Sequence, residues 1–314
     1  MPETWLPTLT VVTASSVPVG LNLKGARGMP GVVLHGWGSL AALLLLGFSA
    51  VALVGLWLGR PLLDTAAARG LHLLAAAFGV MGLLVFGLSY VLLPMFALSP
   101  VPDERRQLVS GAAAIAAIAL AMVAAFGVAP TALRLAAVAA GTLALTLHLQ
   151  LMRRTLASGM RRDFGRALVL MRIGWGSLAL ALGLALALVL GAPAEIFGRL
   201  FGLAVIGGWL LSFLFGVLQR ILPFLAAMHA ARGQKRPPTP SALTLDRALA
   251  WHLRCHVAAL VALAAATVAG AAALAAVAAL AGLVGALSFG VFFVVLMQRL
   301  RQAREGDKPG AALN

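Results

Sequence analysis

Several residue types and motifs are scarce or absent in this chain of 314 residues. Cys255 is the only cysteine, which excludes an intramolecular disulfide, a CxxC redox pair and the covalent attachment of a c-type haem. The sequence contains no GxxxxGKS or GxxxxGKT loop, no HExxH pair and no GxSxG elbow. These absences give no support to a hydrolase or a nucleotide-driven enzyme, and we expect no catalytic residues.

Acidic residues are also few, because Asp and Glu number 9 against 24 Lys and Arg. All of them lie in connections, near the ends of apolar runs or in the terminal segments. Proton-coupled transporters usually carry a carboxylate or a histidine inside the membrane. A carboxylate-based pump therefore has little support, and the six histidines become the residues of interest.

Apolar residues dominate the composition, with 62% hydrophobic and 11% charged residues and a mean hydropathy of +1.01. A chain of this kind cannot bury its apolar surface in one soluble core, and it is expected to be an all-α integral membrane protein. Runs of about 20 apolar residues, the length that spans a bilayer, predict eight transmembrane helices near 32–58, 70–97, 109–128, 132–152, 168–191, 197–228, 250–271 and 275–298.

The net charge of +15 indicates membrane orientation rather than nucleic-acid binding, because of how it is distributed. The two terminal segments and every second connection between the predicted helices contain 17 Lys and Arg in total. The remaining connections, which lie on the opposite side of the membrane, contain 2. Basic residues favour the cytoplasmic side, so we expect both termini in the cytoplasm and anionic lipid headgroups as neighbours. The first 31 residues lack a basic segment ahead of an apolar core, so we expect a cytoplasmic tail there rather than a secretory signal.

An internal repeat organises the chain. GLSYVLLP at 87–94 returns 129 positions later as GVLQRILP at 216–223, and the same offset pairs Phe86 with Phe215. Both copies lie on the second helix of a set of four, which predicts two four-helix units of the same membrane orientation, as in parallel repeats. The expected division is a tail at 1–31, units at 32–152 and 168–298, a basic loop at 153–167 and a basic tail at 299–314.

Glycine and proline recur on these helices. In lipid, helices associate where small residues let their backbones approach, so we expect close contacts at the repeated glycines and at two GxxxG spacings, Gly55/Gly59 and Gly198/Gly202. Pro94 and Pro223 are expected to kink or end their helices.

An imidazole inside a membrane is costly enough to need a partner, and a metal ion or a haem iron is one such partner. His252 and His256 are i and i+4 on one helix face, a spacing at which two imidazoles can approach one metal. The alternative is that histidines near the interface bond headgroups or loop carbonyls. The topology places His72 toward the outer face and the other histidines toward the cytoplasm: His35, His148, His229, His252 and His256.

Arg220 and Tyr90 are also unusual. Arg220 lies near the cytoplasmic boundary beside Gln219, where it either snorkels or pairs with a haem propionate or an anionic solute. Tyr90, the only tyrosine, occupies the repeat position of Gln219. It is expected either to donate a hydrogen bond within the bundle or to pack as an aromatic ring.

The segment from His72 through Tyr90, Pro94, Met95 and Phe96 resembles a His-led helix of the bacterial membrane proteins related to subunit I of haem-copper oxidases, the NnrS proteins among them. A second segment resembles the later Tyr-Lys-x-x-Pro-Phe-Leu run and its following His. Pro223, Phe224, Leu225 and His229 match that run, whereas Gln219 replaces its Tyr and Arg220 replaces its Lys.

The resemblance implies three arcs of four helices, of which this chain would hold two, and roles linked to haem, copper and nitric oxide. It implies haem b or copper as cofactor, with His72 among the ligands. However, the adjacent His-His pair, the His-Pro-Glu segment and the cross-linkable Tyr of a true oxidase are all absent. We therefore expect no oxygen reduction.

Three functions are weighed. The leading expectation is a haem- or metal-binding, oxidase-like inner-membrane protein that serves nitric-oxide or respiratory metabolism by sensing, assembly or cofactor handling. The alternatives are a small-solute permease with Arg220 and Gln219 near its path, and a structural partner of respiratory or denitrification membrane proteins. Two axial histidines of one haem must lie at similar depth, which favours a pair drawn from His35, His148 and His256, whereas the resemblance favours His72.

Overall fold

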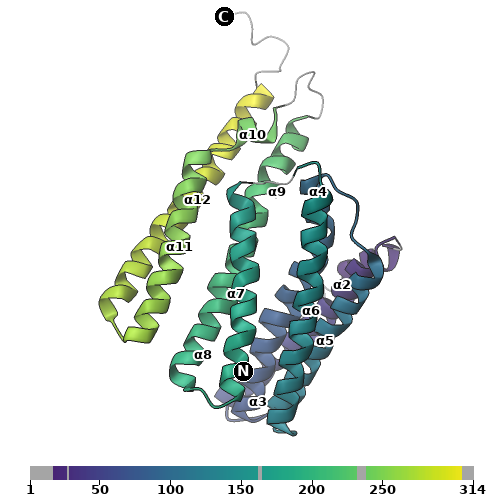
Figure 1. Ribbon diagram of the computed structural model, residues 1–314, viewed down its shortest axis with the longest axis vertical. Helices are drawn as coiled ribbons and strands as arrows, with labels where there is room; N and C mark the ends of the chain where they lie inside the picture. The colour runs from purple at the N-terminus through teal and green to yellow at the C-terminus, as the bar shows by residue number, and fades with distance from the viewer. Residues whose placement is uncertain (1–16, 27, 162–164, 232–237, 306–314) are drawn as a thin grey trace, which may run out of the picture. The chain divides into compact units, whose positions relative to one another are not determined.

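A computed structural model describes residues 17–26, 28–161, 165–231 and 238–305 (Figure 1). Within this part of the chain the protein is all-α, without strands, and eight helices are long and apolar enough to cross a membrane. The protein is therefore a multi-pass membrane protein, as predicted. The elements are α2 (Pro30–Trp57), α3 (Thr65–Leu74), η1 (Ala75–Gly82), α4 (Leu83–Ala97), α5 (Glu104–Ala125), α6 (Pro130–Ser158), α7 (Arg166–Val189), α8 (Ala194–Leu203), η2 (Ala204–Leu211), α9 (Ser212–Ala230), α10 (Pro240–Leu243), α11 (Asp246–Ala269) and α12 (Ala272–Glu305).

The helix ends follow local chemistry. Pro30 and Pro130 stand in the first turns of α2 and α6, where the missing N–H has no intrahelical partner. The carboxylates of Asp64 and Asp103 accept the backbone N–H groups of the residues three positions on, which caps α3 and α5 at 2.9 Å. Gly270 ends α11 in the left-handed conformation that glycine adopts without strain.

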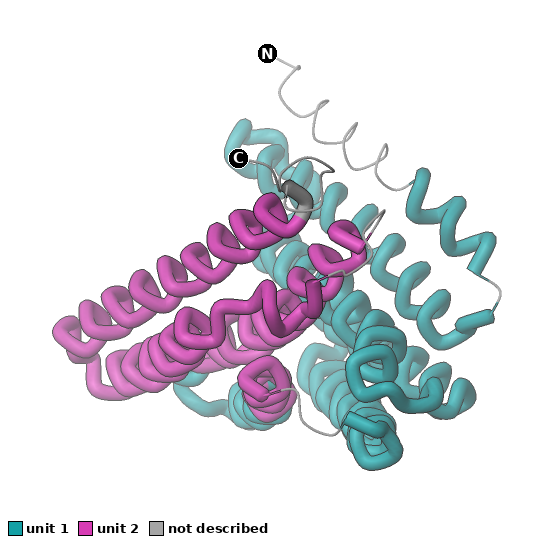
Figure 2. Tube along the Cα trace, turned by 90° about the horizontal axis from the view of Figure 1, so that it is seen from above, with its two compact units in different colours: residues 1–163, 178–197 teal, residues 164–177, 198–314 magenta. Residues whose placement is uncertain are grey.

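The chain divides into two compact units (Figure 2). Unit 1 comprises residues 1–163 and 178–197, and unit 2 comprises residues 164–177 and 198–314. Helix α7 contributes its first half to unit 2 and its second half to unit 1. The predicted tails and the loop at 153–167 lie partly outside the described residues, and α6 extends through the first part of that loop to Ser158.

Matching π-helical stretches mark the repeat. η1 begins at Ala75 and η2 at Ala204, and the preceding helices begin at Thr65 and Ala194, so both pairs differ by the 129 positions of the sequence repeat. π-Helices are rare and usually a single turn. Their recurrence at one offset supports the internal duplication.

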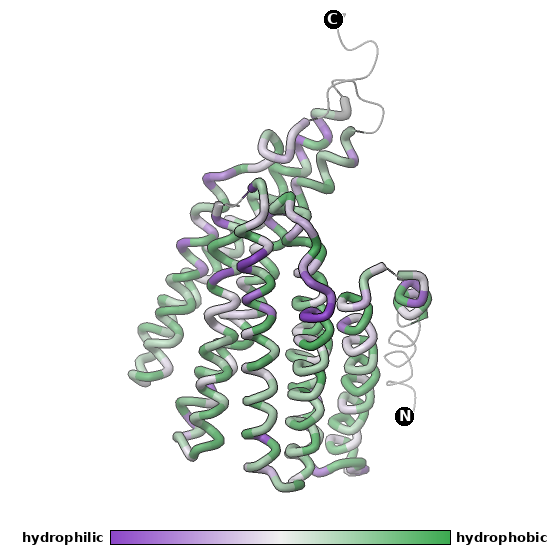
Figure 3. Tube along the Cα trace, turned by 45° about the vertical axis from the view of Figure 1, so that its right-hand side comes forward, coloured by the Kyte–Doolittle hydropathy of each residue, from purple (hydrophilic) through white to green (hydrophobic). Residues whose placement is uncertain are grey.

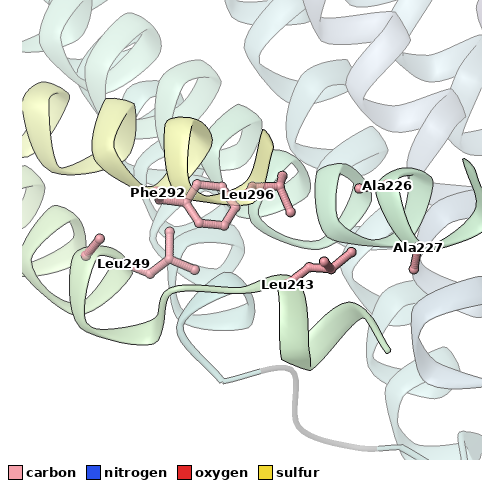
Figure 4. Close-up of a cluster of buried hydrophobic side chains, with 7 residues drawn as sticks. Ala226, Ala227, Leu243, Leu249, Phe292 and Leu296 are labelled. Atoms are coloured by element: carbon pink, nitrogen blue, oxygen red, sulfur yellow. The ribbon is translucent and has the colours of Figure 1, made fainter. Parts of the chain in front are cut away.

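Most helix surface is apolar, and hydrophilic residues gather mainly near helix ends and connections (Figure 3). Large side chains such as Leu280 and Leu287 on α12 are exposed, which is the arrangement expected of helices surrounded by lipid. Burial is concentrated at helix crossings. In unit 2, one such core joins α9, α10, α11 and α12 through Ala226, Ala227, Leu243, Ala248, Leu249, Phe292 and Leu296 (Figure 4).

The repeated glycines make the predicted close contacts. A Cβ at Gly79 would lie 2.5 Å from that of Ala42, and a Cβ at Gly208 would lie 2.5 Å from the hydroxyl of Ser177. The GxxxG prediction was wrong, because a Cβ at Gly198 or Gly202 would meet nothing within 4 Å.

The remaining glycine pair differs from expectation, and of the two outcomes expected for the prolines, the helix end does not occur. Gly59 has a φ of +68° beyond the end of α2, so Gly55/Gly59 is a helix end rather than a packing pair. Pro94 and Pro223 lie inside α4 and α9 and end neither helix.

Candidate functional site

A cluster of buried polar and aromatic side chains lies in the interior of unit 1. His35 comes from α2, Phe86 and Tyr90 from α4, Ser110 from α5 and His148 from α6. His35, Tyr90, Ser110 and His148 are all 0% exposed. Four separate spans therefore meet at this cluster, which we call the unit 1 histidine cluster.

Aromatic packing fixes the two imidazoles of this cluster. The ring of Phe86 stacks on that of His148, with centroids 4.1 Å apart and planes at 13°, and its centroid lies 6.3 Å from that of His35. The ring of Tyr90 has centroids 5.5 Å from His35 and 5.3 Å from His148. Both histidines thus share the same two aromatic neighbours.

Two glycines make room for His35. A Cβ at Gly87 on α4 would lie 2.8 Å from the Cβ of His35, and a Cβ at Gly111 on α5 would lie 2.7 Å from its Cε1. Any larger residue at either position would press on the imidazole. The position of His35 therefore depends on the glycine that the sequence repeat singled out.

A chain of hydrogen bonds fixes the tautomer of His148. Its Nδ1 lies 3.2 Å from the Tyr90 hydroxyl, Tyr90 donates to the Ser110 hydroxyl at 3.3 Å, and Ser110 donates to the Ala144 carbonyl at 3.0 Å. A carbonyl can only accept, so each hydroxyl gives its proton onward and Tyr90 must accept from His148. Neutral His148 therefore carries its proton on Nδ1 and its lone pair on Nε2.

His35 has the same tautomer for a simpler reason. Its Nδ1 lies 2.7 Å from the carbonyl oxygen of Gly31, which again can only accept. The proton is on Nδ1, and the buried Nε2 has no hydrogen-bond partner within the described residues. A histidine whose Nδ1–H is held by a carbonyl and whose Nε2 lone pair is available has the arrangement of a metal ligand.

The donor set of the cluster is two imidazoles with their lone pairs on Nε2, and imidazole suits Zn, Cu, Fe and Ni. A haem would have to lie between the two rings, where Phe86 and Tyr90 already pack against both. Within the described residues, no three His, Cys, Asp or Glu side chains come together as a metal-binding group.

Unit 2 contains a second histidine cluster. His252 and His256 on α11 have ring centroids 5.9 Å apart and planes at 19°. Phe215 of α9 lies 4.4 Å from His252 and 5.8 Å from His256, centroid to centroid, and Phe289 of α12 lies 5.2 Å from His252. Phe215 is the repeat counterpart of Phe86, so the same position packs against two histidines in each unit.

The two histidines of unit 2 form their hydrogen bonds through different ring nitrogens. His252 donates from Nδ1 to the Gly285 carbonyl at 3.0 Å, and its buried Nε2 has no hydrogen-bond partner among the residues that the structure describes. His256 instead uses Nε2, which lies 2.7 Å from the Ser212 hydroxyl. Ser212 donates to the Gly207 carbonyl at 3.2 Å within the π-helical stretch, so it must accept from His256. Unit 2 therefore offers one Nε2 lone pair where unit 1 offers two.

Gln219 is a buried polar residue of unit 2. It is 4% exposed, and among the described residues neither its amide oxygen nor its amide nitrogen has a hydrogen-bond partner. It lies one helical turn beyond Phe215 on α9, where unit 1 has Tyr90. The Tyr90 hydroxyl links His148 to Ser110 in unit 1, whereas the Gln219 amide at the equivalent position of unit 2 forms no such link to a described residue.

The other predicted site residues lie elsewhere. His72 on α3 does not belong to the unit 1 histidine cluster; its Nδ1 lies 3.2 Å from the Ser49 hydroxyl of α2. Arg220 is half-buried on α9, and His229 is exposed in the last turn of that helix. The structure thus brings together His35, His148 and Tyr90 in one unit and His252 with His256 in the other.

Five residues of these clusters were not predicted as site residues from the sequence: Phe86, Phe215, Phe289, Ser110 and Ser212. The repeat did pair Phe86 with Phe215 and was a usable signal. Nothing in the sequence distinguishes the two serines from the other serines of apolar helices.

Comparison of the chain with protein-family models, with curated proteins and with solved structures gave no match.

Proposed function

We propose that this chain is a copper-binding membrane protein in which His35 and His148 hold one monovalent copper ion through their Nε2 atoms. The observation that carries the proposal is the hydrogen bonding of the two imidazoles. Each Nδ1–H is donated, to the Gly31 carbonyl and to the Tyr90 hydroxyl, which places the lone pair of each imidazole on Nε2. Such supporting bonds are typical of ligating histidines.

The charge of the site favours copper in its monovalent state. Burying a charge in an apolar interior is costly unless it is compensated, and the cluster contains only neutral groups: two imidazoles, a phenol and a serine hydroxyl. A divalent ion would bring twice the uncompensated charge of Cu(I). Zn²⁺ also takes four ligands in its structural sites and three protein ligands in its catalytic ones, more than the two imidazoles here.

We further propose that the protein serves respiratory or nitric-oxide metabolism in a bacterial inner membrane, with both termini in the cytoplasm, through metal sensing, assembly or cofactor handling. The support is the resemblance of the segments around Tyr90 and Pro223 to the NnrS group and the distribution of basic residues. Oxygen reduction is not part of the proposal, because the oxidase motifs are missing.

The test is the copper content of purified protein in detergent after loading with Cu(I) under anaerobic conditions and removal of unbound ion. We expect one copper per chain, lost in His35→Ala and in His148→Ala. His72→Ala and His229→Ala are matched controls, since both remove a histidine outside the two clusters. Equal copper in all four variants would refute the site. A Soret band in protein purified from cells grown with haem would instead point to haem.

A second candidate, a small-solute permease, is favoured by one observation. The buried amide of Gln219 has no hydrogen-bond partner in the described ranges, and a polar solute that passed this point would supply one. Counterflow uptake in proteoliposomes that is abolished in Gln219→Ala but unaffected in His35→Ala would favour transport over copper binding.

A further inference from the structure

A cavity lies at one end of unit 1, where α4 ends and α5 begins. Its volume is about 150 Å³, and it is lined by the Pro-rich connection before α5 and by the last turns of α6: Pro100, Val101, Pro102, Asp103, Leu151, Arg154, Thr155 and Ser158. These residues lie at the ends of membrane-spanning helices. The cavity therefore opens at the depth of the lipid headgroups.

The cavity carries one charge of each sign. Asp103 and Arg154 both line it, yet they form no ion pair with each other, and Arg154 makes no hydrogen bond within the described residues. One carboxylate oxygen of Asp103 caps α5 by accepting the N–H of Arg106 at 2.9 Å. The other oxygen is available, so the cavity presents a separated cation and anion to a ligand.

A buried hydroxyl adds a donor at the same place. Thr155 is 3% exposed, and its hydroxyl has no hydrogen-bond partner in the part of the chain that the structure describes. Thr142 and Thr146 of the same helix instead donate to carbonyls four residues back, at 2.8 Å. A threonine inside a helix normally satisfies its hydroxyl in that way, so Thr155 retains an unused donor beside the cavity.

We infer that this cavity binds the headgroup of a zwitterionic phospholipid that carries a primary ammonium, such as phosphatidylethanolamine. The guanidinium of Arg154 and the Thr155 hydroxyl receive the phosphate, and the carboxylate of Asp103 accepts N–H bonds from the ammonium. Asp103 opposes a purely anionic headgroup at the same position. A choline headgroup has the same two charges but no N–H to donate.

The experiment is native mass spectrometry of the purified full chain, equilibrated in detergent with equal amounts of phosphatidylethanolamine, phosphatidylcholine and phosphatidylglycerol. We expect one phosphatidylethanolamine to be retained preferentially. Asp103→Asn keeps the helix cap, because Asn also caps, and should lower that retention about tenfold, as loss of a charge-assisted hydrogen bond predicts. Arg154→Gln should do the same.

Matched controls are Glu104→Gln and Arg153→Gln, since both residues are exposed neighbours that do not line the cavity. Both should retain phosphatidylethanolamine as the wild type does. Equal retention of the three lipids, a preference for phosphatidylglycerol, or equal losses in the control variants would overturn the inference. So would displacement of the lipid by an equal concentration of soluble glycerophosphoethanolamine, because the site would then recognise a free solute. None of these outcomes depends on copper binding.

Discussion

Phe86 and Phe215 lie 129 positions apart in the chain, and each packs against two buried histidines. In unit 1 the histidines come from two helices, α2 and α6, whereas in unit 2 both come from α11. The repeat thus preserves the phenylalanine but not the helices that supply the imidazoles. Unit 2 has only one Nε2 lone pair because the Ser212 hydroxyl accepts from Nε2 of His256.

Tyr90→Phe should weaken copper binding without unfolding the protein. The substitution removes the hydroxyl that accepts from His148 Nδ1 and keeps the ring that packs on both histidines. Loss of such a supporting bond typically lowers metal affinity by about 10–100-fold. Competition with a Cu(I) chelator measures the change. Ser89→Ala is the control, because Ser89 bonds only the Val85 carbonyl of its own helix; an unchanged affinity in Tyr90→Phe would contradict the proposed role.

Gly87→Ala should destabilise unit 1 and reduce copper binding together. The added Cβ would lie 2.8 Å from that of His35, and overpacking of this kind costs about 1–3 kcal/mol. Thermal unfolding followed by circular dichroism, together with copper content, gives the two readouts. In Gly183→Ala, where a Cβ would meet nothing within 4 Å, we expect no loss of either. Equal behaviour of the two variants would show that the close approach of α2 and α4 does not position His35.

Ser212→Ala should raise the copper content from one to two ions per chain. The Ser212 hydroxyl occupies Nε2 of His256 at 2.7 Å, and its removal allows the other tautomer, with lone pairs on Nε2 of both His252 and His256. Their ring centroids, 5.9 Å apart, match the separation of roughly 6 Å expected when two imidazoles share one ion at metal–nitrogen distances of about 2 Å. Metal analysis measures the number of copper ions per chain. A value that stays at one would show that His252 and His256 do not form a second copper site.

Gln219→Leu should raise the thermal stability of the ligand-free protein. A buried amide with no partner costs about 1–3 kcal/mol, and leucine removes both unsatisfied atoms. Gln107 is the matched comparison, because it is equally buried but donates to the Pro102 carbonyl at 2.7 Å. Gln107→Leu should therefore lower stability. A destabilised Gln219→Leu protein would mean that the amide is satisfied by a bound group, as the permease hypothesis requires.

Most of the fold could be predicted from the sequence. Apolar runs of spanning length located all eight helices, because the bilayer forces each run to satisfy its own backbone hydrogen bonds. The helix ends were placed less well; α6, for example, continues to Ser158, beyond the predicted 152. Arginine residues at 153 and 154 do not stop a helix once it has left the apolar layer.

The site was predicted only in part. Depth arguments grouped His35 with His148, and the structure places these two together with Tyr90. The same arguments could not separate His256, which was expected at a similar depth but belongs to unit 2. The π-turns at Ala75 and Ala204 leave no local sequence signature, and the direction of the hydrogen bonds depends on carbonyls such as that of Ala144, which only the assembled helices bring near.

The most direct test of the copper site is X-ray absorption at the copper edge of the Cu(I)-loaded protein. We expect a first shell of two nitrogen atoms with the multiple-scattering pattern of imidazole, and no shell at all in the His35→Ala/His148→Ala double variant because copper is no longer retained. A first shell containing sulfur, from Cys255 or a methionine, or an unchanged spectrum in the double variant, would contradict the assignment of His35 and His148 as the ligands.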